Sequence, residues 1–268
     1  MKLGLARRLA ALLSGLLAVS GCGALPWPER APAEQPVELS YRPPPDGVGS
    51  EHAAQLAAAL SASYVRVLIV DRSETRAGRD APSGPGIVTG ASGVIVDRRG
   101  YVVTAAHIAT DAALDALIHT IDGRRHEATV VAVAPERELA LIKMAPYPGI
   151  QVARLGDSAA LAAGDRVLAI GTPDGREGVV FQGRVSNPRR AQRIQYGAYG
   201  YDDAIELVLD AEPGTSGAPL FNEQGELVGI IASFSLGNTN PDEYAPTHLA
   251  WAVPSNAIAR YLREIVGP

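Results

Sequence analysis

Three short segments of the chain hold the residue types that carry out nucleophilic acyl transfer. His107 ends the β-prone run YVVTAAH, Glu138 begins the run ELALIK, and Ser216 lies in the glycine-flanked segment PGTSGAPL. A serine hydroxyl is a poor nucleophile unless an imidazole takes its proton, and the imidazole needs a carboxylate to fix its tautomer. Acyl transfer also needs backbone N–H groups that hold an oxyanion, and the glycines beside Ser216 fit that need.

The order of these residues along the chain narrows the architecture that could position them. The base comes first, the acid second and the serine last, which is the order of chymotrypsin-type barrels, whereas α/β-hydrolases have the order serine, acid, base. The G-x-S-x-G elbow of those hydrolases also fails here, because its fifth position is Ala218. Barrels of strands are therefore expected to carry the site.

The rest of the sequence supplies such elements. An Ala-rich helix is expected over 51–62 and a terminal helix over 255–266, with Ser255 as its N-cap. Pro and Gly interrupt the pattern over 145–157, which indicates a change of subdomain there. Between the helices, short β-prone runs separated by Gly, Pro and Asp turns predict antiparallel barrels or a sandwich. The predicted strands are 63–70, 86–96, 101–105, 115–120, 128–134, 138–144, 166–171, 177–185, 204–209, 217–221, 226–234 and 248–253.

The first 21 residues have the organisation of an export signal. Three basic residues precede an apolar run over 9–19, which is too short to span a bilayer as a permanent helix, so 1–21 is interpreted as a signal peptide. The tetrapeptide VSGC at 19–22 resembles the bacterial lipobox, in which the Cys is lipidated and becomes the first residue of the mature chain. An incidental Cys in an ordinary signal peptide is the alternative. Cys22 is the only cysteine, so no intramolecular disulfide can form.

The composition after the signal separates a spacer from a folded body. Residues 22–50 hold seven prolines and little apolar periodicity, which predicts an extended tether that begins at the lipidated Cys22. Loss of the signal's three basic residues would change the formal net charge from −5 to about −8, which argues against nucleic acid as a partner. Neither metal-ligand spacing nor a nucleotide or phosphate motif is present, so no metal and no cofactor is expected. The histidines without ligand spacing are His52, His119, His126 and His248.

From about Ile87 to Ile265 the chain resembles the HtrA/Deg branch of the trypsin-like serine proteases. The resemblance implies an all-β fold of two antiparallel six-stranded barrels and a C-terminal helix, within a protease domain over 51–268. The first barrel is expected at about 63–147 and the second at about 150–254. Its motifs, in order, are SGVIVD at 92–97, TAAH at 104–107, LGDS at 155–158, LAIG at 168–171, the Ser216 segment, GII at 229–231 and AVPSN at 252–256.

The same resemblance assigns roles to the site residues. His107 is expected as the base and Ser216 as the nucleophile, with the N–H groups of Gly214 and Ser216 as the oxyanion hole. The acid of the family is an Asp, and the position that matches it in register is Glu138. Glu136 and Asp111 are the nearby rivals, and neither has the matching sequence context.

Other departures from the family keep a second function open. Thr215 stands where the family has Asn or Asp, Ala218 stands where it has Gly, and the chain stops after the terminal helix, where many relatives add a PDZ domain. A catalytically inactive homologue that binds peptides or acts as a chaperone-like module is therefore the alternative function. Asp210 lies six residues before the serine, where trypsin-like enzymes have the floor of the primary specificity pocket. An acid there would favour Arg or Lys side chains, although pockets of HtrA-like enzymes are usually apolar.

The sequence as a whole predicts an extracytoplasmic serine endopeptidase. It would cleave unfolded or flexible protein segments through an acyl-enzyme, with proteins or peptides as substrates and a membrane contact through the lipid on Cys22. Gly23 is not the Asp that retains lipoproteins in the inner membrane, which favours the outer membrane, facing the periplasm. The sequence leaves a homo-oligomer open.

Overall fold

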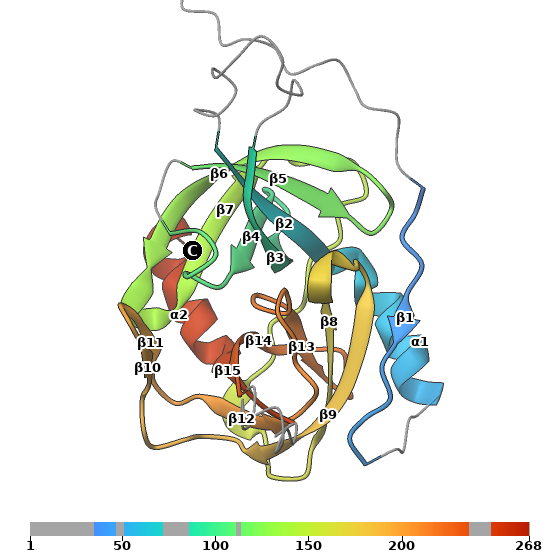
Figure 1. The fold of residues 1–268 in the computed structure, drawn as a ribbon, viewed down its shortest axis with the longest axis vertical. Coiled ribbons are helices and arrows are strands. Elements are labelled where there is room, and N and C mark those ends of the chain that lie inside the picture. The colour runs from blue at the N-terminus through green and yellow to red at the C-terminus, as the bar shows by residue number, and fades with distance from the viewer. Residues whose placement is uncertain (1–34, 47–50, 72–85, 111–113, 236–247, 268) are drawn as a thin grey trace, which may run out of the picture. The chain divides into compact units, whose positions relative to one another are not determined.

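The structure is a computed structural model that describes residues 35–46, 51–71, 86–110, 114–235 and 248–267. The expected signal peptide, the lipidation site at Cys22 and the rival acid Asp111 lie outside the described residues. Figure 1 shows the described elements and their labels.

Six strands form the first barrel: β2 (Tyr64–Asp71), β3 (Gly86–Asp97), β4 (Tyr101–Thr104), β5 (Asp115–Thr120), β6 (Arg125–Ala134) and β7 (Leu139–Met144). They close in the order β2-β3-β4-β7-β6-β5, and every pairing is antiparallel. The interior is filled by Val, Ile, Ala and one Met, because a six-stranded barrel is too narrow for many large side chains. This packing fixes the strand ends from which the candidate base and acid emerge.

Six further strands form the second barrel: β8 (Arg166–Gly171), β9 (Val179–Asn187), β12 (Ile205–Val208), β13 (Pro219–Asn222), β14 (Leu227–Phe234) and β15 (Leu249–Pro254). The order β9-β12-β15-β14-β13-β8 closes through the antiparallel pairing of β8 with β9. The all-β fold of two six-stranded barrels is therefore confirmed. The terminal helix α2 (Ser255–Val266) is also confirmed, but its N-cap is Pro254 and Ser255 is its first helical residue. The Ser255 hydroxyl donates to the Gly156 carbonyl at 2.8 Å.

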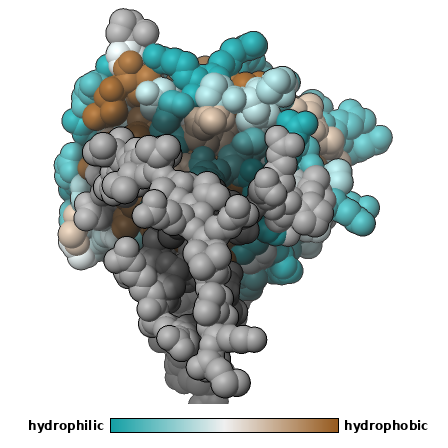
Figure 2. All heavy atoms as spheres, turned by 90° about the horizontal axis from the view of Figure 1, so that it is seen from above, coloured by the Kyte–Doolittle hydropathy of each residue, from teal (hydrophilic) through white to brown (hydrophobic). Residues whose placement is uncertain are grey.

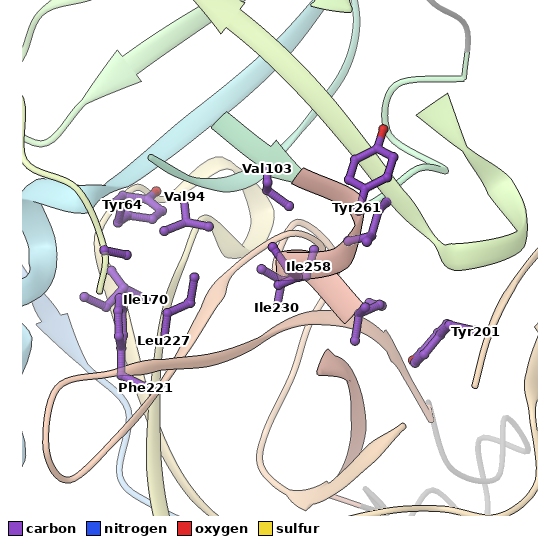
Figure 3. Packing of buried hydrophobic residues seen from close by; sticks show 14 of the residues in the cluster. Tyr64, Val94, Val103, Ile170, Tyr201, Phe221, Leu227, Ile230, Ile258 and Tyr261 are labelled. Atoms are coloured by element: carbon purple, nitrogen blue, oxygen red, sulfur yellow. The ribbon is translucent and has the colours of Figure 1, made fainter. Parts of the chain in front are cut away.

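The two barrels and helix α2 share one hydrophobic cluster. Tyr64, Val94 and Val103 of the first barrel face Ile170 and Ile230 of the second (Figure 3). The helix adds its apolar face to this cluster, and its Ile258 and Tyr261 are both buried. Burial of this apolar surface is the main force that holds one barrel against the other.

Within the predicted tether, the described residues 35–46 are packed on the folded body. Strand β1 (Ser40–Tyr41) pairs in parallel with β9, and the N–H of Val37 donates to the Ile121 carbonyl of the first barrel at 2.8 Å. Residues 35–46 are called the strap below. The sequence did not indicate it, because its two-residue strand lies within a Pro-rich stretch. Helix α1 (Glu51–Leu60) and the 3-10 turn η1 (Ser61–Ser63) follow and lead into β2.

Exposed large hydrophobic side chains of the described residues are scattered over many elements. One face, seen in Figure 2, carries mostly hydrophilic residues with small apolar patches between them. Single exposed apolar residues of this kind are ordinary for a folded protein. In the part of the chain that the structure describes, no helix is both long and apolar enough to cross a membrane. The exposed hydrophobic residues are Tyr41, Ile87, Val131, Leu155, Val208 and Ile265.

Candidate active site

The candidate base lies at the end of β4. Buried Ala105 and Ala106 continue this strand into a turn, which is closed by hydrogen bonds from the N–H groups of Ile108 and Ala109 to their carbonyls. The small alanines let the chain pass close to the barrel interior and leave the next side chain at its edge. The side chain of His107 is consequently about one quarter exposed (25%) and can meet groups from both barrels.

The candidate acid is fully buried, at 0% exposure. Glu138 follows the 3-10 turn η3 (Pro135–Arg137) and has a left-handed backbone, with φ of 55°. This conformation is uncommon for residues other than glycine and occurs mostly where the surroundings require it. Its Oε1 accepts a short hydrogen bond from Nδ1 of His107 and lies 3.4 Å from the main-chain N of that residue. The structure therefore brings together the base and the acid that the sequence predicts.

The candidate nucleophile belongs to the second barrel. The hydroxyl of Ser216 donates to Nε2 of His107 at 3.0 Å, which completes a line of hydrogen bonds from acid to base to serine. Gly214 and Gly217 on either side have φ of +94° and +80°. A Cβ at Gly214 would lie 2.2 Å from the Thr172 carbonyl oxygen, so only glycine fits this close approach.

Two carbonyl hydrogen bonds set the orientation of the loop before the serine. The Pro213 carbonyl accepts from the N–H of Asp174 at 3.0 Å, and the Gly214 carbonyl accepts from the Ser92 hydroxyl at 2.9 Å. The Thr215 carbonyl, whose peptide carries the N–H of Ser216, accepts from the N–H of Ala218 at 2.9 Å. Among the described residues, neither the N–H of Gly214 nor that of Ser216 has an acceptor. Two uncommitted N–H groups beside a nucleophile are the arrangement that stabilises an oxyanion.

Thr215 and Ala218, the two residues beside Ser216 that differ from those of the family, fit into the structure. The hydroxyl of Thr215 donates to the Glu212 carbonyl at 2.6 Å and so closes the loop that carries the serine. Ala218 is completely buried within the core of the second barrel. Neither side chain lies between the serine and the base. Both substitutions are therefore compatible with an intact site.

Asp210 does not join this group. Its carboxylate forms a short hydrogen bond with Nδ1 of His248, and the two side chains are 38% and 36% exposed. The N–H of Leu209 donates to the His248 carbonyl at 2.7 Å, which ties the two segments together. The structure thus places the predicted specificity residue in a pair that the sequence did not predict. The rival acid Glu136 has an exposed side chain that pairs with Arg137.

The sequence interpretation also missed a hairpin that covers the base. Strands β10 (Ile194–Tyr196) and β11 (Tyr199–Tyr201) pair with each other and carry two tyrosines to the imidazole. The ring centroids of Tyr196 and Tyr199 lie 5.9 and 6.1 Å from that of His107, both edge-on at 74°. The signal that could have found the hairpin is the Gly197-Ala198 pair between two tyrosine-bearing runs, a spacing typical of a two-residue turn.

Among the residues that the structure describes, no group of three or more His, Cys, Asp and Glu side chains could hold a metal ion. The arrangement provides a nucleophile, a base, a carboxylate and two oxyanion donors.

Comparison with known proteins identifies this arrangement. Residues 91–230, just over half of the chain, match the family described as the trypsin-like peptidase domain. A probable periplasmic serine endoprotease DegP-like from Brucella suis is 32% identical over 203 residues, which cover 73% of this chain and 37% of that protein. The periplasmic serine endoprotease DegP of Escherichia coli is 32% identical over 179 residues, covering 65% and 35%.

A solved structure of an HtrA-type protease is similar to this chain in fold. An HtrA-type protease, AlgW, solved with a tripeptide, has a TM-score of 0.64 and 25% identity, with 80% of this chain and 63% of that chain covered. The chain therefore belongs to the trypsin-like serine proteases, in the HtrA/Deg branch. It spans little more than a third of the length of the curated relatives that it matches.

Proposed function

We propose that the protein is an active serine endopeptidase that cleaves peptide bonds within unfolded or flexible protein segments outside the cytoplasm. The observation that carries this proposal is the unbroken line of hydrogen bonds from Glu138 through His107 to Ser216. Uncommitted oxyanion donors beside the serine add to it. An inactive peptide-binding homologue has no need of such an alignment, so the geometry favours activity over that alternative.

The proposed reaction has two halves joined by an acyl-enzyme. The Ser216 oxygen attacks the scissile carbonyl carbon while Nε2 of His107 takes the hydroxyl proton, and Glu138 stabilises the resulting imidazolium. The N–H groups of Gly214 and Ser216 bind the negative oxygen. Collapse breaks the C–N bond, and His107 returns its proton to the leaving amine. Water then gives a proton to His107 and attacks the ester carbon. The second collapse breaks the bond to the Ser216 oxygen, which takes the proton back from His107, and the acyl group leaves as a carboxylic acid.

The location forms a separate proposal. The named relatives are periplasmic, and the N-terminal sequence favours lipidation at Cys22. Lipoprotein processing would supply two or more acyl chains, and two are enough for stable anchoring where one is marginal. We place the protein at the outer membrane, facing the periplasm. Replacement Cys22→Ser should abolish the acyl modification seen by mass spectrometry; persistence of the same modification would contradict the lipobox assignment.

Labelling with a fluorophosphonate tests the activity, because this probe needs an activated serine and no knowledge of the substrate. The wild-type protein should be modified on Ser216 and should degrade casein. Ser216→Ala should lose both labelling and proteolysis, while Ser186→Ala, at an exposed position outside the site, should retain both. A folded wild-type protein that stays unlabelled at high probe concentration would favour the inactive homologue.

A further inference from the structure

The buried carboxylate of Glu138 has a second oxygen that His107 does not bind. Glu138 gives one carboxylate oxygen to His107, and its Oε2 has no hydrogen-bond partner among the described residues. A buried carboxylate oxygen without a donor is costly, and such an oxygen in a native fold calls for a group that can satisfy it. The candidate donors are therefore the hydroxyl groups that neighbour this carboxylate.

The hydroxyl of Tyr196 is the donor that the fold brings to this position. It lies 3.5 Å from Nδ1 of His107, the atom that binds the same carboxylate, and 3.4 Å from the Ala232 carbonyl oxygen. Because Nδ1 already donates its proton to Glu138, it cannot also accept from the tyrosine. Burial raises the pKa of Tyr196, and the charge of Glu138 raises it further. The phenol consequently keeps its proton and can donate it.

The hairpin that carries this tyrosine is fastened to the turn that carries the acid. The guanidinium of Arg193 donates to the Glu136 carbonyl in η3 at 2.5 Å and pairs with Asp202 at 2.6 Å. Glu136 is two residues before Glu138. A movement of the hairpin would therefore move the acid as well, and the two segments act as one support for the imidazole.

We propose that Tyr196 is a positioning residue that donates its hydroxyl to the carboxylate of Glu138 and so holds the acid in line with His107. The inference rests on the proposed proteolytic function and deepens it. It also accounts for a Glu at this position, since the longer side chain needs a second contact to fix its carboxylate. The competing role for the hydroxyl is a purely structural bond to the Ala232 carbonyl.

The first test compares two tyrosines of the same hairpin. Tyr196→Phe should lower kcat on one fluorogenic peptide by about tenfold, as expected for a lost hydrogen bond to a charged group, and should change KM by less than about twofold. Tyr201→Phe is the matched control, because its buried hydroxyl bonds to Ser233 at 2.8 Å and not to His107 or Glu138. It should lower the melting temperature and leave kcat unchanged. A Tyr196→Phe protein with wild-type kcat would overturn the inference.

A double-mutant cycle with Glu138→Gln separates the two roles of the hydroxyl. If Tyr196 acts through the acid, Tyr196→Phe should change kcat by less than about twofold once the carboxylate is gone, since residues in one network are not additive. An equal loss in both backgrounds would show that the tyrosine acts only through the fold and would overturn the inference.

A readout without turnover keeps the test independent of the proposed function. In Ser216→Ala protein, the proton that Nδ1 of His107 shares with Glu138 can be followed by ¹H NMR. Removal of the Tyr196 hydroxyl leaves the carboxylate a stronger acceptor, so Tyr196→Phe should move this resonance downfield, and Tyr201→Phe should not. An unmoved resonance contradicts the role of Tyr196. A moved resonance, combined with wild-type protein that the fluorophosphonate never labels, contradicts only the proposed activity.

Discussion

Two pairs of imidazole and carboxylate in this chain have the same chemistry and different surroundings. In the first, His107 meets a carboxylate that is fully buried and has a serine on its other nitrogen. In the second, His248 meets Asp210, both side chains are more than one third exposed, and no described nucleophile contacts the ring. A pair of imidazole and carboxylate is therefore not expected to act as a base on its own. Burial of the carboxylate and a hydroxyl on the second ring nitrogen distinguish the first pair from the second.

Removal of each imidazole in turn should give the largest contrast. His107→Ala should lower kcat/KM by about 10⁴- to 10⁶-fold, because the serine loses its base. His248→Ala should change it by less than about tenfold, since its loss only frees an exposed carboxylate. Steady-state kinetics on one fluorogenic peptide measures both. Similar losses in the two variants would end the distinction between the pairs.

Removal of the charge of the acid should have the second largest effect. Glu138→Gln should keep the fold and lower kcat by about 10²- to 10⁴-fold, because the amide presents the wrong group to the imidazole. Glu138→Asp should retain measurable activity. Glu136→Gln, whose side chain is exposed, should change kcat by less than about threefold. The acid is misassigned if Glu136→Gln is inactive and Glu138→Gln matches wild type, with folding checked by circular dichroism.

Loss of the Asp210 carboxylate from the exposed pair should change substrate selectivity, and only by a small factor. Asp210 lies where trypsin-like enzymes have the floor of the primary specificity pocket. If it has that role, Asp210→Asn should lower kcat/KM for peptides with Arg or Lys before the scissile bond relative to matched Ala peptides. The expected change in this ratio is about two- to fivefold, because a charge that is 38% exposed is screened by water. A set of peptides that differ only at that residue measures the ratio. A change of equal size for Ala peptides would exclude a role in selectivity.

A third pair, away from the site, should affect stability and not chemistry. Burial alone raises the pKa of Glu177, but hydrogen bonds from His119 and Arg66 outweigh it and lower the pKa below its usual 4.5. A carboxyl of this kind stabilises the fold above its unfolded pKa, and this stabilisation is lost as the pH falls through the folded value. Glu177→Gln should therefore cost about 1–3 kcal/mol near neutral pH.

Urea unfolding as a function of pH checks this prediction. The difference in unfolding free energy between wild type and Glu177→Gln should be full near neutral pH and shrink below about pH 4.5. A difference that grows in acid would have the wrong sign for a carboxyl with a lowered pKa.

The barrels could be predicted from the sequence because their signals are local. Runs of Val, Ile and Leu between turn residues indicated all twelve barrel strands to within a few residues. The hairpin β10-β11 was missed because each strand has three residues, most of them partly exposed, so no burial pattern marks it. The strap was missed for a related reason, since its pairing depends on a distant strand edge.

Some features of the candidate site could likewise be predicted from the sequence, and others could not. The segments around His107 and Ser216 predicted that these two residues would meet, because short motifs fix the local backbone. The left-handed backbone of Glu138 could not be predicted, because the sequence marks no turn that requires it. The pairing of Asp210 with His248 joins residues 38 positions apart and depends on how two loops meet. The contact of Tyr196 with the base spans 89 positions and depends on the docking of one barrel on the other.

If the N-terminal end is anchored as proposed, the strap would set how far the folded body can move from that anchor. The strap is held by a two-residue pairing with β9, by the Val37 N–H on the Ile121 carbonyl, and by the ion pairs of Arg42 with Glu212 at 2.8 Å and of Asp46 with Arg184 at 3.1 Å. So few bonds should open long before either barrel unfolds. Release of residues 35–46 would lengthen the predicted tether by about 40 Å, at roughly 3.3–3.6 Å per residue. Glu212 lies next to the loop that carries Ser216, so release of the strap would also remove the ion pair of Arg42 with Glu212. The reach of the folded body and the support of the serine loop would therefore change together.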